Sequence, residues 1–121
     1  MSQSATDDTA ATLARHIKAI FSGDVDAVLQ NFNDDSVVFT PDGLVRGLTA
    51  IRKDTEAFFS DSPPEMLRAF EIVRQEADGE VGYLLWKAEP FVTLAAETFV
   101  VRGGKIVAQT FAILDGDDLA A

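Results

Sequence analysis

The first third of the chain has apolar residues at helical spacing. Apolar side chains recur every three or four positions from residue 10 to residue 21, and again from 28 to 32. Gly23-Asp24 separates the two runs. Glycine is unfavourable inside a helix and aspartate is a good N-cap, so this pair predicts the end of one helix and the start of the next. We therefore expect two amphipathic helices, preceded by a loose polar tail over residues 1–6.

The rest of the chain is rich in β-branched and aromatic residues and is divided by turn sequences at 41–43, 78–79 and 103–104. Residues 65–77 are ambiguous, because their Glu, Arg, Leu and Met content also suits a helix, whereas Asp78-Gly79 is typical of a hairpin turn. We predict a third helix over 48–60 and an acidic tail over 115–121. The predicted strands are 36–40, 44–46, 69–76, 81–88, 91–102 and 105–114.

This order of elements predicts an α+β fold in one domain over residues 1–121. Sequential hairpins indicate a mostly antiparallel sheet, and helices concentrated in the N-terminal half indicate that they pack on one face of it. Long strands twist, so the sheet should curve strongly. Three helices across its concave side would close a cone around a pocket.

Composition and charge exclude several classes of partner. The 121 residues carry 20 acidic and 10 basic side chains, a net charge of −10, which argues against nucleic acid and against an anionic membrane surface. There is no cysteine and one histidine, so thiolate chemistry and multi-histidine metal sites are excluded. No secretory signal and no apolar stretch of membrane-spanning length is visible. We expect a cytoplasmic protein.

Four short motifs occur in a specific order and spacing, although none is specific by itself. They are Gly23-Asp24-x-x-Ala27, Phe32-x-Asp34-Asp35, Pro41-x-Gly43 and Arg46-Gly47. Together they resemble the nuclear transport factor 2-like superfamily, and within it the SnoaL-like and ketosteroid isomerase-like branch. The resemblance implies a curved six-stranded sheet, a conical hydrophobic pocket and a homodimer through the outer face of the sheet. The superfamily includes isomerases, polyketide cyclases, epoxide hydrolases, dehydratases and non-catalytic modules, so the fold alone does not fix a function.

Two residues are candidate catalytic groups. His16 lies on the apolar side of the first predicted helix, and its imidazole can exchange a proton near neutral pH. By resemblance, it stands where ketosteroid isomerases carry a tyrosine hydrogen-bond donor. Strand alternation places Glu97 on one face with Ala95 and Phe99, where burial would raise its pKa and keep it protonated as a donor. By resemblance, it falls where the isomerases place such an acid.

Each of these residues also has a purely structural interpretation. His16 could be a hydrogen-bonded core or rim histidine. Glu97 could lie on the outer face of the sheet, paired with Lys87 or Arg102.

Thr40 departs from the isomerase pattern. It precedes Pro41, where the isomerases place the aspartate that shuttles the proton, and a hydroxyl cannot act as that base near pH 7. The neighbouring Asp42 is a carboxylate, but its position in the turn should direct it to solvent. By resemblance, further candidate ligand-binding residues lie on strand faces that point into the pocket, namely Val38, Trp86, Phe99, Gln109 and Phe111, together with Thr40. Trp86 could equally be an ordinary core residue.

Three functions remain open at this point. The chain could be an acid–base enzyme of isomerase, cyclase or dehydratase type, using His16 and Glu97 on a small apolar carbonyl compound. It could instead bind a small molecule without turnover, or be a dimeric interaction module whose cavity is filled by aromatic side chains. No phosphate-binding, nucleophile-elbow or metal-ligand motif is present, so no cofactor is expected.

Overall fold

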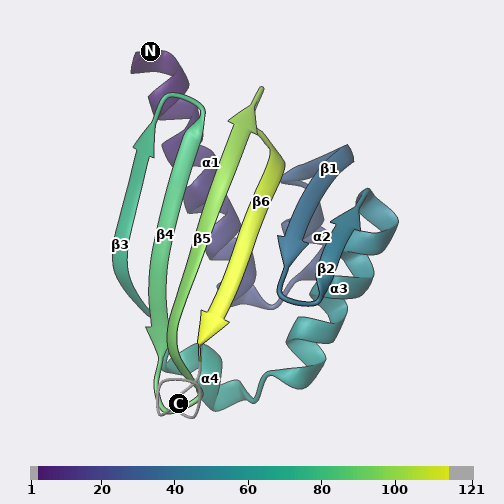
Figure 1. The fold of residues 1–121 in the computed structure, drawn as a ribbon, viewed down its shortest axis with the longest axis vertical. Coiled ribbons are helices and arrows are strands. Elements are labelled where there is room, and N and C mark those ends of the chain that lie inside the picture. Colours follow the sequence, from purple (N-terminus) through teal and green to yellow (C-terminus); the bar gives the residue numbers. More distant parts are fainter. Residues whose placement is uncertain (1–2, 115–121) are drawn as a thin grey trace.

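A computed structural model describes residues 3–114, and their fold is α+β, as predicted (Figure 1). Four helices lie in the first 68 residues. They are α1 (Gln3–Ser22), α2 (Val25–Leu29), α3 (Leu48–Asp61) and α4 (Pro64–Arg68). The strands are β1 (Phe32–Thr40), β2 (Gly43–Arg46), β3 (Glu71–Asp78), β4 (Val81–Ala88), β5 (Val92–Arg102) and β6 (Lys105–Leu114).

All six strands form one sheet, in the order β2-β1-β6-β5-β4-β3. Every neighbouring pair is antiparallel except β1 and β6. These two strands, the first and last of the described chain, pair with each other in parallel. The four C-terminal strands are consecutive antiparallel neighbours, which confirms the predicted hairpins. The sheet curves around α1, which lies behind it in the view of Figure 1.

The core lies between the concave face of the sheet and the helices. Burial alternates along β4 and β5, so that Leu84, Trp86, Ala95 and Phe99 face the helices while the intervening side chains face outward. Leu13 of α1 is 1% exposed and packs into this core. Within residues 3–114, no helix is long and apolar enough to cross a membrane.

The sequence prediction was wrong at the N-terminus. Residues 3–6 were expected to be loose, but they form the first turn of α1. The hydroxyl of Thr6 accepts a hydrogen bond from the backbone N–H of Gly79, and the hydroxyl of Thr9 donates one to the Gly79 carbonyl at 2.6 Å. Both bonds attach the start of the helix to the β3–β4 turn. The predicted tail at 115–121 lies outside the described residues.

Two other predicted boundaries also need correction. The second helix was expected to include Phe32, but it ends at Leu29, and β1 begins at Phe32 because this residue pairs with Ile106. Three helices were expected, and the structure has a fourth, α4, which begins at Pro64 directly after Pro63. A proline is favourable in the first turn of a helix, so a sequence interpreted as a helix end also starts a helix.

Gly82 allows α1 to approach the sheet closely. A Cβ atom on Gly82 would lie 2.8 Å from Cδ1 of Leu13 and 3.2 Å from Cγ2 of Thr9. We predict that Gly82→Ala lowers the free energy of unfolding by roughly 1–3 kcal/mol, because overpacking forces buried groups apart. Denaturant unfolding measures this loss. Leu13→Ala should relieve part of the crowding, so the double variant should lose less than the sum of the single losses. Strictly additive losses would contradict the proposed clash.

Candidate functional site

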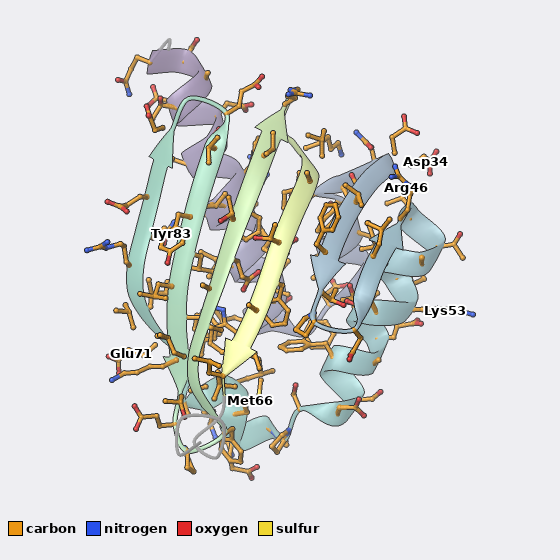
Figure 2. All side chains as sticks on the ribbon, viewed as in Figure 1. Asp34, Arg46, Lys53, Met66, Glu71 and Tyr83 are labelled. Carbon is orange, nitrogen blue, oxygen red and sulfur yellow. The ribbon has the colours of Figure 1, made fainter. Side chains whose placement is uncertain are left out.

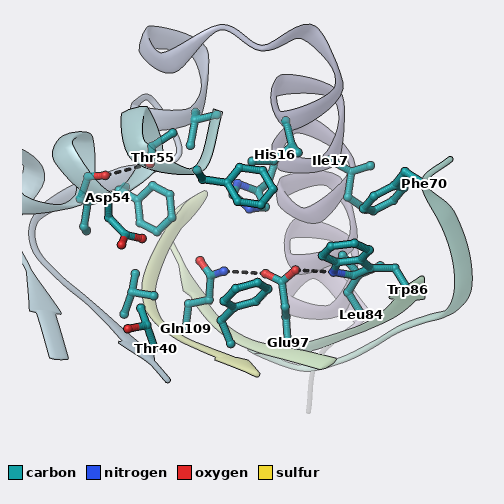
Figure 3. Close-up of a pocket in the computed structure, with 17 residues that line it drawn as sticks. His16, Ile17, Thr40, Asp54, Thr55, Phe70, Leu84, Trp86, Glu97 and Gln109 are labelled. Carbon is teal, nitrogen blue, oxygen red and sulfur yellow. Dashed lines mark hydrogen bonds between the residues drawn. The ribbon is translucent and has the colours of Figure 1, made fainter. Parts of the chain in front are cut away.

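A pocket of about 100 Å³ lies between the concave face of the sheet and helices α1 and α3. Its lining is mostly aromatic and aliphatic, with a few polar side chains (Figure 3). Several aromatic rings surround the cavity. The polar side chains come from α1, α3, β1, β5 and β6 and are described in turn.

Glu97 lies in this pocket, and its carboxyl group is held by two donors. Trp86 donates its Nε1–H to Oε2 of Glu97 at 2.7 Å, and Gln109 donates from Nε2 to Oε1 at 2.6 Å. The three residues come from the adjacent strands β4, β5 and β6, whose alternation directs them to the concave face. The interpretation of Glu97 as an outer-face residue is therefore wrong.

Glu97 is 8% exposed, and this burial has an electrostatic consequence. Burial disfavours the charged form and raises the pKa of Glu97 to about 7, while the hydrogen bonds from Trp86 and Gln109 act in the opposite direction. Near neutral pH the group is therefore present in both its protonated and its ionised form. A carboxyl in this state can take up or release a proton at physiological pH.

His16 faces the same pocket from α1 (Figure 3). Its ring makes edge contacts with Phe32 and Phe99, at centroid distances of 5.8 and 5.5 Å. Its Nδ1 atom is buried and has no hydrogen-bond partner among the described residues. Burial lowers the pKa of His16 to about 4, so the imidazole is neutral at pH 7.

The other predicted ligand-binding residues fall into two groups. Val38, Thr40, Trp86, Gln109 and Phe111 line the pocket. Phe99 does not line it, because its side chain is completely buried behind the pocket against the ring of His16. That these residues bind a ligand remains a prediction.

The Thr40 hydroxyl is committed to the turn that follows it. It donates to the Gly43 carbonyl at 2.9 Å and accepts from the backbone N–H of Asp42 at 3.1 Å. Asp42 is exposed, as expected for its turn position. Thr40 therefore contributes a satisfied hydroxyl to the pocket wall and no base.

Sequence reasoning missed Asp54, a second acidic side chain that lines the pocket. Ile51, Thr55 and Phe58 line the pocket with it, and these four residues share one face of α3 at helical spacing. A single carboxylate on an otherwise largely apolar stripe is the signal that could have revealed it. Asp54 keeps contact with solvent, which places it at the mouth. Partial burial and the charge of Asp42 raise its pKa.

Phe70 was also missed. Its ring stacks on Trp86 at a centroid distance of 4.6 Å and meets the edge of Phe21 at 4.7 Å. It follows α4, the helix that was not predicted, so its position could not be derived from the sequence pattern. Within residues 3–114, no cluster of three or more His, Asp or Glu side chains could hold a metal ion.

Comparisons with known proteins agree with this architecture. A protein from Mesorhizobium loti, an NTF2-like protein of unknown function, is 18% identical over 90% of this chain and 93% of its own, with a TM-score of 0.74. A candidate polyketide cyclase from Sinorhizobium meliloti is 18% identical over 84% and 94%, with a TM-score of 0.71. An LEH-like epoxide hydrolase from M. tuberculosis is 18% identical over 90% and 84%, with a TM-score of 0.68.

At these identities the likeness shows a shared fold and leaves the reaction open. A search of curated proteins found no match. The model of the SnoaL-like domain matches residues 13–109, which is most of the chain and includes both His16 and Glu97. The chain is therefore a member of the SnoaL-like domain family, within the NTF2-like superfamily, as its motifs predict.

Proposed function

We propose that this protein is a cofactor-independent acid–base enzyme that acts on a small apolar carbonyl compound. The observation that carries the proposal is the buried Glu97 carboxyl, whose pKa of about 7 lets it exchange a proton at neutral pH inside a mostly apolar pocket. The pocket also contains a neutral histidine with an unpartnered nitrogen. Clustered titratable groups with shifted pKa values in a pocket are typical of catalytic sites.

Glu97 acts as the general base in this proposal. Both of its carboxyl oxygens accept hydrogen bonds, from the indole N–H of Trp86 and the amide of Gln109. Such donors favour the ionised form, which is the form that can accept a proton. A carboxylate with a pKa of about 7 is also a far stronger base than an imidazole with a pKa of about 4, so Glu97 takes the proton in preference to His16.

His16 acts as a hydrogen-bond donor to the substrate oxygen. Its imidazole is neutral at pH 7, and we assign the proton to Nε2, because a proton on Nδ1 would leave a buried N–H without an acceptor. A neutral imidazole that donates to a carbonyl oxygen stabilises the negative charge that develops there during enolisation.

The reaction class follows from these two roles. Glu97 accepts the proton from the carbon next to the carbonyl, the C–H electron pair moves into the enolate, and the enolate oxygen accepts the hydrogen bond from His16. Return of the proton to the same or another carbon completes an exchange or an isomerisation and restores the Glu97 carboxylate. The fold that this chain shares with a candidate polyketide cyclase and an epoxide hydrolase is compatible with such acid–base chemistry.

The size of the pocket limits the buried part of a ligand to one ring at most. The cavity measures about 100 Å³. An engineered protein cavity of about 150 Å³ accommodates benzene, so a steroid is far too large to fit inside without a rearrangement. Part of a slightly longer ligand could extend through the mouth beside Asp54.

A cyclic ketone of this size tests the proposal. We predict that the wild type accelerates exchange of the α-protons of cyclohexanone with D₂O, measured by ¹H NMR, and that Glu97→Gln lowers the enzymatic rate by about 100-fold or more. The wild-type rate should rise with pH through about 7, because the ionised carboxyl is the active form and the pKa of Glu97 is about 7. The introduced glutamine amide can still accept from Trp86 and donate to Gln109 if the Gln109 amide rotates, so the variant should fold.

Glu76→Gln is the matched control, because Glu76 is an exposed residue of β3. It should leave the exchange rate unchanged. Equal exchange by the wild type and by Glu97→Gln would reject the role of Glu97. Binding of cyclohexanone by the wild type, seen as shifts of the Trp86 and His16 resonances without any exchange, would favour a ligand-binding protein without turnover.

We also propose that the protein forms a homodimer through the outer face of the sheet. Helix α1 lies behind the sheet in the view of Figure 2, so the face toward the viewer is the outer face. The outer face carries Tyr83 and Leu85 of β4 and several exposed apolar side chains, among them Phe39, Val81 and Leu114. Exposed apolar side chains gathered on one face are typical of an interface.

Thr98 lies on β5 near the middle of this face. We predict that Thr98→Glu converts the dimer to a monomer, because a two-fold interface places two like charges close together. Light scattering coupled to size-exclusion chromatography measures the mass. Thr49→Glu, on the exposed surface of α3, adds the same charge and should leave the dimer intact. A monomeric wild type, or a dimeric Thr98→Glu variant, would contradict the proposed interface.

The expected cytoplasmic location and the expected absence of a cofactor stay predictions.

A further inference from the structure

The charges around the pocket all have one sign. Asp54 and Glu97 line it, His16 is neutral at pH 7, and within residues 3–114 no lysine or arginine lines it. An anionic ligand would therefore lose its hydration without gaining a cationic partner. The pocket fits neutral and positively charged ligands instead.

Asp54 has no cation of its own within the described chain. No ion pair to it forms among residues 3–114. The basic neighbours in α3 are directed elsewhere, since Arg52 pairs with Asp26 at 2.8 Å and Lys53 points outward into solvent (Figure 2). The charge of Asp42 acts on Asp54 as well, so a cation at the mouth would relieve the repulsion between two carboxylates.

Two further features of the same pocket point to an organic ligand. His16 lines the pocket and is only 6% exposed, and its buried Nδ1 has no hydrogen-bond partner among the described residues, so a polar side chain without a protein partner at that atom faces the ligand space. Phe58, Phe70 and Phe111 also line the pocket. The faces of aromatic rings attract ammonium groups, so these walls are compatible with a cationic ligand as well as with an apolar one.

We propose that Asp54 is a specificity-determining residue that binds a protonated amine at the mouth of the pocket. Combined with the proposed function, on which this inference rests, the substrate class becomes a one-ring carbonyl compound that carries a basic amine. The ammonium group contacts Asp54 and the ring lies between the aromatic walls. The carbonyl end reaches toward His16 and Glu97, which lie on the other side of the pocket in Figure 3.

Three probes with the same ring test this proposal: cyclohexylamine, cyclohexanol and cyclohexanecarboxylate. We expect the wild type to bind the amine more tightly than the alcohol and to bind the carboxylate weakest, as measured by NMR titration of the pocket resonances at pH 7. Asp54→Asn should reduce the preference for the amine over the alcohol by roughly fivefold, and should leave the affinity for the alcohol unchanged.

Glu56→Gln is the matched control, because Glu56 is an exposed acid of the same helix that does not line the pocket. It changes the net charge as Asp54→Asn does, so it separates a local contact from the general field of an acidic protein. It should retain the wild-type preference. The proposal is overturned if the wild type binds none of the three probes, if it binds the carboxylate as tightly as the amine, or if Asp54→Asn retains the wild-type preference.

These measurements are separate from the test of catalysis. Binding of the probes requires no turnover, and Asp54 has no part in the proton transfer assigned to Glu97. A protein that prefers the amine but exchanges no protons would contradict the proposed reaction and leave the ligand class standing. A protein that exchanges protons without preferring the amine would contradict the proposed ligand class and leave the proposed reaction standing.

Discussion

The two hydrogen bonds that hold the Glu97 carboxyl constrain most of the pocket. Trp86, Glu97 and Gln109 come from three adjacent strands, so their bonds form only if β4, β5 and β6 keep the observed register. A slip of one residue in any of these strands would turn its side chain to the outer face of the sheet. It would also leave a buried polar group unpaired, which costs more than an ordinary hydrogen bond contributes.

Burial of Glu97 and of His16 makes stability depend on pH in opposite directions. Glu97 keeps its proton up to a pKa of about 7 in the folded protein but loses it near 4.5 when unfolded, so its contribution to the free energy of unfolding falls by about 3 kcal/mol as the pH rises across this range. The pKa of His16 falls from 6.5 to about 4 on folding, so its contribution is lost as the pH falls. Keeping Glu97 buried lowers the stability of the protein at neutral pH, and a cost of this kind is consistent with a functional role for the residue.

Much of this arrangement could be predicted from local patterns. Strand alternation showed which side chains share a face, and the family resemblance directed the face of Glu97, Trp86 and Gln109 to the pocket, while helical spacing placed His16 on the apolar side of α1. What the patterns missed depends on tertiary contacts. The first turn of α1 forms where Thr6 and Thr9 bond to Gly79. Phe70 reaches the pocket only because α4 precedes it, and Phe99 faces inward but lies behind His16. Alternation predicts which face a side chain takes and does not predict its depth.

The central claim is that Glu97 is a buried carboxyl that titrates near neutral pH, and ¹³C NMR of glutamate-labelled protein tests it directly. The side-chain carboxyl resonance of Glu97 can be assigned by its absence in Glu97→Gln and followed from pH 4 to pH 9. The account predicts a midpoint at about 7. It also predicts a higher midpoint in Trp86→Phe, because loss of the indole N–H removes a hydrogen bond that favours the ionised form. A wild-type midpoint near the ordinary value of 4.5 would contradict the account.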